Sequence, residues 1–393
     1  MLNERCVKLG KVRSSIRELF EYGKKRKAEI GEEAVFDFSI GNPSVPAPEE
    51  VQSALIDLIE NTDPVALHGY TSAQGDYSVR KSVADNLNSR FKTKLNADCI
   101  YMTCGASAAL TISLSALLNN GDEVIVFAPF FPEYRVFIES AGGKPVIIDC
   151  DEAFQPDLGK FEKALNDNTK AVIINSPNNP SGVIYSEDTI KKIVALVENQ
   201  KNTVYIISDE PYRELVFSGV KIPFIMNYYK RSIVCYSYSK TLSLPGDRIG
   251  YIAVNNEAED FADIYAGVLG AGRALGFVCA PATFQRLVAR CQGVTSDLSI
   301  YKGNRDRLLQ KLTEYGFEFA KPDGAFYLFL KSPDGSAKAF AERAKKYEIL
   351  IVAGDDFGCG GYVRLSYCVS PEMIERALPS FKKLAESYKL CQG

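Results

Sequence analysis

The sequence has no tryptophan and only one histidine, His68, among its 393 residues. Zinc sites usually draw on histidine and cysteine ligands, and a Ser-His-Asp triad needs a histidine as its base. The ten cysteines are scattered and include no Cys-x-x-Cys pair. We therefore predict no metal site, and we expect thiols that are mostly buried and unpaired in the reducing cytoplasm.

Long apolar runs and an excess of one charge are missing as well. No segment is long and apolar enough to span a bilayer, and residues 1–13 lack the apolar centre of a signal peptide. The net charge is −3, which argues against nucleic acid or a membrane as a partner. A length of 393 residues predicts one large domain and a smaller one.

Unbroken apolar runs are present, and they alternate with helical patterns in the middle of the chain. The runs cover residues 124–127, 171–174, 204–207, 233–236 and 249–254, and the helical patterns include residues 107–118 and 187–198. Strands of this composition are typically buried on both faces. The alternation predicts an α/β fold with a mostly parallel sheet between layers of helices.

The two ends of the chain follow other patterns. Ser15-Ile16-Arg17-Glu18 resembles a capping box that opens a short helix through Tyr22, followed by a strand at residues 36–40 and a helix at 49–60. After about residue 285 the pattern is α+β, with helices at 298–315, 337–347 and 371–390 and strands at 324–329 and 362–366.

Lys240 is the first candidate for catalysis. It ends Ser237-Tyr238-Ser239-Lys240, directly after an apolar run, and Arg248 follows eight residues later. A nearby cation makes a lysine amine more nucleophilic by lowering its pKa, and arginine also grips phosphate through two N–H groups. The pair indicates pyridoxal phosphate held as a Schiff base. The alternative is a solvated surface lysine.

Two segments at the ends of predicted strands have backbones suited to ligands. The small residues Gly105, Ala106 and Ser107 open a helix whose free N–H groups could receive a phosphate, although tight packing also explains them. Asn179 lies in a rigid Pro- and Gly-containing turn and could offer its amide to a ligand. A plain strand-ending turn is the alternative.

Two charged residues have apolar neighbours. Asp209 ends the run at residues 204–207 and needs a cation partner there; a protonated pyridine nitrogen would serve, and a helix cap or a buried ion pair is the alternative. Arg364 is the only charge in the strand at 362–366 and suits a bidentate grip on a carboxylate. A structural ion pair with an acid of the small domain is the alternative.

Taken together and in this order, the segments resemble the fold-type I pyridoxal-phosphate enzymes, specifically the class I/II aminotransferases related to aspartate aminotransferase. The resemblance extends from Phe38 to Ser366 and is carried by Asn-Asn-Pro-Ser-Gly, Ser-Asp-Glu-Pro-Tyr and Ser-x-Ser-Lys followed by Arg-Ile-Gly-Tyr. It implies an N-terminal arm and part of the small domain at residues 1–48, a large cofactor-binding domain at 49–285, and a small C-terminal domain at 286–393. It also implies a homodimer with shared active sites.

The resemblance implies a role for each matching residue. Lys240 would form the imine with the cofactor and then move the proton of the substrate Cα, and Asp209 would pair with the ring nitrogen. Asn179 and Tyr212 would hydrogen-bond the phenolic oxygen and lower the imine pKa. The other implied roles are a phosphate cup of Gly105, Ala106, Ser107, Ser237 and Arg248, a stacking ring in Phe131 where many relatives have tryptophan, Tyr70 reaching the partner's cofactor phosphate, and α-carboxylate binding by Arg364 and the Gly41 backbone.

Substrate choice is where the chain departs from its relatives. Some bacterial relatives have a lysine at the position of the uncharged Ser107, and in others an arginine crosses from the partner subunit, from the region of Arg273. We expect Arg273 to bind a distal carboxylate, with aspartate or glutamate as substrate; a surface or interface arginine is the alternative.

The expected reaction moves an amino group from an L-amino acid to a 2-oxo acid by a ping-pong path. A C–S β-lyase similar to cystathionine β-lyase would use the same residues. A non-catalytic regulator of this fold is a third alternative, but the residues before Phe36 are too few for a DNA-binding winged helix.

Overall fold

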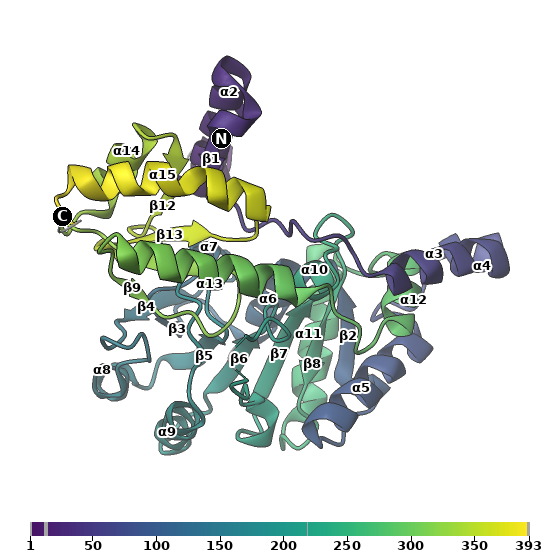
Figure 1. Ribbon diagram of the computed structural model, residues 1–393. Helices are drawn as coiled ribbons and strands as arrows, with labels where there is room; N and C mark the ends of the chain where they lie inside the picture. The colour runs from purple at the N-terminus through teal and green to yellow at the C-terminus, as the bar shows by residue number, and fades with distance from the viewer. Residues whose placement is uncertain (1, 12–14, 218, 391–393) are drawn as a thin grey trace.

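The computed structural model describes residues 2–11, 15–217 and 219–390. A large twisted sheet flanked by helices lies below a smaller group of strands and long helices (Figure 1). The strands are β1 (Phe36–Asp37), β2 (Ile100–Thr103), β3 (Glu123–Phe127), β4 (Lys144–Ile148), β5 (Thr169–Asn175), β6 (Tyr205–Asp209), β7 (Ser232–Ser237), β8 (Gly250–Val254), β9 (Phe319–Ala320), β10 (Tyr327–Lys331), β11 (Ile349–Leu350), β12 (Val352–Ala353) and β13 (Tyr362–Ser366).

The α-helices are α1 (Glu4–Lys11), α2 (Ser15–Ile30), α3 (Glu49–Asn61), α4 (Pro64–His68), α5 (Tyr77–Phe91), α6 (Ala106–Leu117), α7 (Glu133–Ser140), α8 (Leu158–Ala164), α9 (Glu187–Glu198), α10 (Tyr238–Thr241), α11 (Phe261–Leu275), α12 (Ala282–Arg290), α13 (Leu298–Glu314), α14 (Ala337–Lys345) and α15 (Pro371–Ser387). Short 3-10 helices cover Glu32–Ala34, Ala97–Cys99 and Ile225–Asn227.

The large sheet has the strand order β2-β8-β7-β6-β5-β3-β4. Its pairs are parallel except those of β8, which runs antiparallel to both neighbours. Successive residues of one strand face opposite helix layers. On β5, Ile173 packs in the cluster with α6, α7 and α11, whereas Val172 and Ile174 pack with α5, α8 and α9. Burial of both faces explains the unbroken apolar runs, and the predicted fold class is confirmed.

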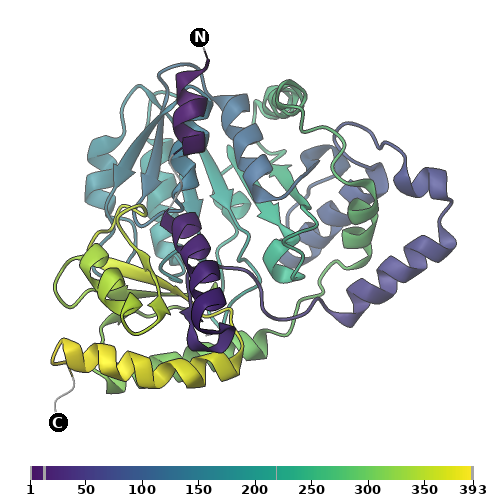
Figure 2. The ribbon, with the colours of Figure 1, turned by 90° about the horizontal axis from the view of Figure 1, so that it is seen from above.

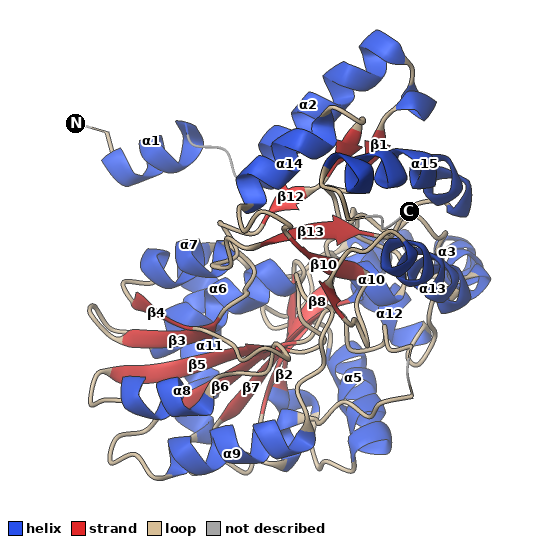
Figure 3. Cartoon of the chain, turned by 60° about the vertical axis from the view of Figure 1, so that its left-hand side comes forward, coloured by secondary structure: helices blue, strands red, loops and turns tan. Residues whose placement is uncertain are grey.

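The smaller sheet is antiparallel, with the order β12-β13-β10-β9, and buried residues of α13, α14 and α15 share one core with it. The N-terminal segment joins this part, because β1 pairs with β11. Figure 2 shows α2 lying beside this group, and α1 lies next to α7 at the edge of the molecule (Figure 3). Helix α12 spans residue 285 and packs on α3 and α5. The domain boundaries at residues 48 and 285 remain a prediction.

Some local predictions were wrong. Helix α2 continues to Ile30 instead of ending at Tyr22, and the Ser15 hydroxyl has no hydrogen-bond partner among the described residues, so the capping box does not form. The first strand covers only Phe36–Asp37. Strand β10 starts at Tyr327 instead of residue 324, because Ala325 has a φ of 55° in a turn that an extended strand cannot contain.

Candidate active site

A pocket of ≈ 280 Å³ lies at the carboxyl ends of β5, β6 and β7, between the start of α6 and the smaller sheet. This is the edge where open α/β sheets bind ligands. The predicted site residues that line it are Gly41, Ala106, Ser107, Phe131, Asn179, Asp209, Tyr212, Ser237, Lys240, Arg248 and Arg364. Residues more than 300 positions apart in the chain therefore meet in one pocket.

Lys240 projects from α10, a one-turn helix that continues directly from β7. The Ser237 hydroxyl caps this helix by accepting a hydrogen bond from the Ser239 N–H at 3.2 Å. The Lys240 Nζ donates to the Gly41 carbonyl at 2.6 Å. Burial lowers the pKa of Lys240 to about 8, and the nearby Arg364 and Arg248 contribute to the lowering. A solvated surface lysine does not describe this environment.

Asp209 ends β6 and is 5% exposed. One carboxylate oxygen, Oδ2, accepts a hydrogen bond of 2.5 Å from the Tyr134 hydroxyl, and the other, Oδ1, has no partner among the described residues. Burial raises the pKa of Asp209 to about 7, and the bond from Tyr134 works in the opposite direction. A buried oxygen with no donor suits a protonated nitrogen of a ligand.

Arg364 is the central residue of β13 and is 2% exposed. Its Nη1 donates to Asn179 Oδ1 at 3.1 Å, its Nη2 donates to the Ser39 carbonyl at 2.5 Å, and its Nε has no partner in the part of the chain that the structure describes. Across the described ranges no carboxylate lies within ion-pair distance of this guanidinium. The structural ion pair considered as an alternative is therefore absent from the described residues, and the unneutralised charge suits a ligand's carboxylate.

The start of α6 has the features of a phosphate site. Gly105 precedes it with a φ of 84°, and a Cβ there would lie 3.0 Å from Arg248 Nη2, so the backbone and the guanidinium approach closely. Among the residues that the structure describes, the Arg248 guanidinium donates only to carbonyl oxygens, those of Pro245 at 3.1 Å and Cys104 at 3.3 Å. The Ser237 and Ser239 hydroxyls, 2.7 Å apart, also line the pocket. Free N–H groups, hydroxyls and a guanidinium suit an anion.

Sequence reasoning missed two tyrosines that contact the predicted groups. Tyr134 follows Phe131 by three residues, and this spacing at a helix start could have revealed it. Tyr327 lies 2.9 Å from Tyr212, hydroxyl to hydroxyl, and also lines the pocket. No local signal marks Tyr327, because Tyr212 is 115 residues away in the chain.

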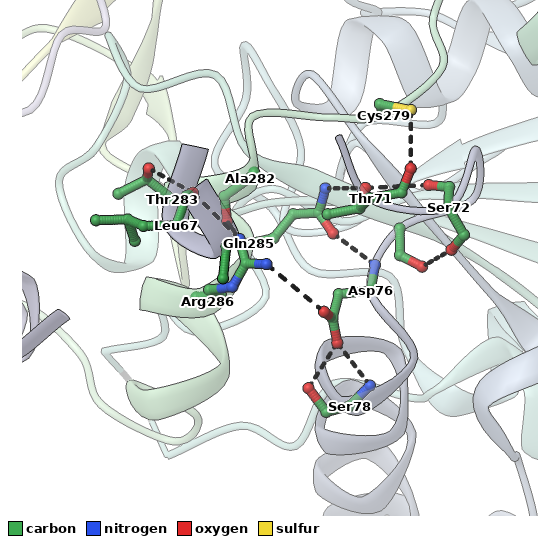
Figure 4. Close-up of polar contacts among 12 residues, drawn as sticks. Leu67, Thr71, Ser72, Asp76, Ser78, Cys279, Ala282, Thr283, Gln285 and Arg286 are labelled. Atoms are coloured by element: carbon green, nitrogen blue, oxygen red, sulfur yellow. Dashed lines mark hydrogen bonds and ion pairs between the residues drawn. The ribbon is translucent and has the colours of Figure 1, made fainter. Parts of the chain in front are cut away.

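Three predicted residues, Gly105, Tyr70 and Arg273, do not line the pocket of their own chain, although Gly105 directly precedes the lining residue Ala106. Tyr70 is 98% exposed, although its neighbours are held firmly (Figure 4). Thr71 accepts hydrogen bonds from Cys279 Sγ at 3.3 Å and Gln285 Nε2 at 3.2 Å. Arg273 is exposed near the end of α11. The proposed positions of Tyr70 and Arg273 near a partner's cofactor stay predictions.

The polar groups that face the pocket fit pyridoxal phosphate and an amino acid together. Asp209 Oδ1 suits the ring nitrogen, the start of α6 with Arg248 suits the phosphate, and Arg364 suits the substrate carboxylate. With an amine of lowered pKa in their midst, the fold and pocket have the groups that an enzyme needs for carbonyl chemistry through a lysine.

Comparison with known proteins specifies this class further. The family model described as aminotransferase class I and II matches residues 33–381. A probable aspartate aminotransferase of Methanocaldococcus jannaschii is 32% identical, over 98% of this chain and 100% of that protein. A crystal structure of an amino transferase from Eubacterium rectale has a TM-score of 0.97 and 53% identity over 99% of both chains. The aspartate aminotransferase of Thermotoga maritima has a TM-score of 0.87 and 30% identity over 97% of this chain and 99% of that chain.

The chain belongs to the class I and II aminotransferases. It is an aminotransferase that uses pyridoxal phosphate, so the predicted family, enzyme class and cofactor are confirmed. The relatives' names do not favour the C–S lyase alternative; besides aspartate aminotransferases they include an aromatic-amino-acid aminotransferase of Thermococcus litoralis, 28% identical over 96% of this chain and 97% of that protein. Within the described residues, no helix combines the length and apolarity needed to cross a membrane.

Proposed function

We propose that this pocket transfers the amino group of an L-amino acid to a 2-oxo acid by a ping-pong path, with aspartate or glutamate among the substrates. The main support is Arg364, a buried guanidinium without an acid partner among the described residues, in the same pocket as Lys240. An unpaired buried charge is costly, and the carboxylate of an amino acid would neutralise it. Cytoplasmic location remains a prediction that rests on the scattered, unpaired cysteines.

The cofactor would be held by residues that already face the pocket. Asp209 Oδ1 would bind the ring nitrogen, and Asn179 and Tyr212 would bind the phenolic oxygen. The phosphate would lie among Ser237, Arg248 and the first N–H groups of α6, and Phe131 would stack on the ring. When bound, pyridoxal phosphate supplies an electron sink for the electrons released at the substrate Cα.

Lys240 would move the proton. With its pKa lowered to about 8, about a tenth of the Nζ is neutral at pH 7, far more than for an ordinary lysine, and this neutral amine can accept a proton from the substrate Cα. Arg364 would bind the carboxylate on the same carbon, and the Gly41 carbonyl would keep the amine within the pocket. Because the amine of Lys240 and the carboxylate of the substrate would both be held in place, the proton transfer would be effectively intramolecular.

A single-turnover measurement tests this reaction. The loaded enzyme, given an amino acid without an acceptor, should release one equivalent of the matching 2-oxo acid per site and then stop until a 2-oxo acid is added. Continuous release of ammonia and pyruvate from cystathionine or cysteine would instead support the lyase alternative. A panel of amino donors with 2-oxoglutarate as acceptor would then define the preferred donor.

The proposed homodimer is supported by exposed apolar residues in the segment from residue 59 to residue 77, which contains Tyr70. Val65 is 80% exposed, Ile59 61% and Tyr77 62%. Exposed apolar groups of this kind often mark a protein interface. Tyr70 does not line its own pocket, and hydrogen bonds to the adjacent Thr71 hold this segment (Figure 4), so the exposed Tyr70 ring would be available to a second copy of the chain.

Arg273 provides a test of both the dimer and the substrate. It is exposed and outside its own pocket, so it would act on a distal carboxylate only from a partner subunit. We expect Arg273→Leu to raise KM for aspartate by about 10- to 100-fold and to change KM for alanine far less. Arg376→Leu, at an exposed position of α15, is the matched control. Equal effects on both substrates, or a monomeric mass by light scattering, would contradict the assignment.

A further inference from the structure

Tyr327 lies at a junction of the proposed cofactor and substrate groups. It is the first residue of β10 and is 2% exposed. Its hydroxyl is 2.9 Å from that of Tyr212, and its ring faces the Arg364 guanidinium, with Cζ 4.7 Å from the ring centroid. The hydroxyl also occupies the space that a Cβ on Gly41 would need, so it packs directly against the backbone that holds Lys240.

When a ligand is present, the number of available protons decides which hydroxyl of the Tyr212–Tyr327 pair donates to the other. Each phenol has one proton to donate. If Tyr212 donates its proton to the phenolic oxygen of the cofactor, its own oxygen is left to accept a bond from Tyr327. Burial raises the pKa of Tyr327 to about 12, so it keeps its proton. Successive hydrogen bonds strengthen one another, so donation by Tyr327 makes Tyr212 a better donor.

We propose that Tyr327 is a positioning residue that donates to the Tyr212 hydroxyl and fixes the direction in which Tyr212 offers its proton to the cofactor. This inference rests on the proposed role of Tyr212. Tyr327 acts through its hydroxyl on the cofactor side and through its ring beneath Arg364 on the substrate side.

Tyr327→Phe and Tyr327→Leu separate the effect of the hydroxyl from that of the ring. In the loaded enzyme, the absorbance of the lysine-bound cofactor changes with pH. Tyr327→Phe should raise the midpoint of this absorbance change by about 0.5 to 1 pH unit. Without Tyr327 behind it, Tyr212 is a weaker donor to the phenolic oxygen of the cofactor and therefore stabilises the deprotonated form of the lysine-bound cofactor less. The phenylalanine keeps a ring beneath Arg364, so KM should change by less than about twofold. Tyr327→Leu loses the ring as well and should raise KM by about tenfold.

A double-mutant cycle tests the route through Tyr212. Tyr212→Phe should shift the midpoint further than Tyr327→Phe, and the double variant should match Tyr212→Phe alone. Tyr367→Phe is the control for loss of a buried hydroxyl, because Tyr367 is also fully buried and donates to the Ala325 carbonyl at 3.2 Å. It should leave the midpoint unchanged.

Three results have distinct meanings. An unchanged midpoint in Tyr327→Phe, with the wild type titrating normally, overturns the inference. Additive shifts in the double variant overturn it too, because Tyr327 would then act independently of Tyr212. If the wild type never shows the absorbance of a lysine-bound cofactor, the proposed role of Lys240 fails instead.

Discussion

Tyr134→Phe tests how the fold prepares Asp209 for its proposed contact with the cofactor. The substitution removes one oxygen atom and the 2.5 Å hydrogen bond to Asp209 Oδ2. Asp209 Oδ1 already lacks a partner, so the buried carboxylate would lose its one side-chain donor among the described residues. Both side chains are almost fully buried, and water does not readily replace the lost bond.

The expected magnitude follows from the charge on the acceptor. A hydrogen bond to a charged group contributes about 1.5–3 kcal/mol, which corresponds to about 1–2 pH units in the pKa of Asp209. Burial already raises that pKa to about 7, so the apoenzyme of the variant should keep Asp209 protonated at neutral pH. The cofactor then meets a neutral acid instead of a carboxylate, and its dissociation constant should increase by about 10- to 100-fold.

Two measurements check this prediction. Carbon-detected NMR of the apoenzyme reports the pKa of Asp209, and fluorescence titration with pyridoxal phosphate reports the dissociation constant. Tyr101→Phe is a matched control, because Tyr101 is also fully buried and donates to a backbone carbonyl, that of Phe277, at 2.8 Å. An unchanged Asp209 pKa together with cofactor affinity within about twofold of the wild type would refute the reasoning.

The other predictions concern the two titrating groups of the pocket. Burial raises the pKa of Asp209 from 3.8 to about 7. The free energy of unfolding of the apoenzyme should therefore fall as pH rises through this interval, because the folded state has to accommodate a buried carboxylate. Apo Asp209→Asn should therefore be more stable than apo wild type at pH 8, by at most about 4 kcal/mol in urea unfolding, and the difference should vanish near pH 4; equal stability at pH 8 would contradict the assigned burial. Lys240→Ala should bind pyridoxal phosphate without the absorbance of the lysine-bound form and lose turnover by several orders of magnitude, whereas near-normal activity would overturn the assignment. In the wild-type apoenzyme, the rate at which Lys240 reacts with the aldehyde should rise with a midpoint near pH 8, and a midpoint above pH 10 would show that burial does not lower its pKa.

Local pattern was sufficient for most of the large sheet. The runs at residues 124–127, 171–174 and 233–236 lie within β3, β5 and β7, because a strand buried on both faces has to be apolar throughout. The orientation of β8 was not predictable in this way. The apolar run of β8 looks like the runs of the parallel strands, yet β8 pairs antiparallel with β7. The connection between the two strands decides this orientation.

Segment ends were less predictable, because tertiary contacts determine them. Helix α2 extends past Tyr22 to Ile30, and its Arg26 pairs with Glu348 at 2.6 Å, a contact across 322 residues. A capping signal at Ser15 carries no information about such a partner. The start of β10 depends in the same way on the turn at Ala325.

The sequence by itself determined the three charged groups expected in the pocket. Lys240, Asp209 and Arg364 stand in recognisable local contexts, and each context is written in a few adjacent residues. Whether these groups have partners was decided only by the tertiary structure, which leaves Asp209 Oδ1 and Arg364 Nε without one among the described residues and places Tyr134 against Asp209 and Tyr327 against Tyr212. The physical reason is that a side chain's identity is local. Its pKa, its hydrogen bonds and whether any of its polar atoms lack a partner depend on segments that packing brings together from distant parts of the chain.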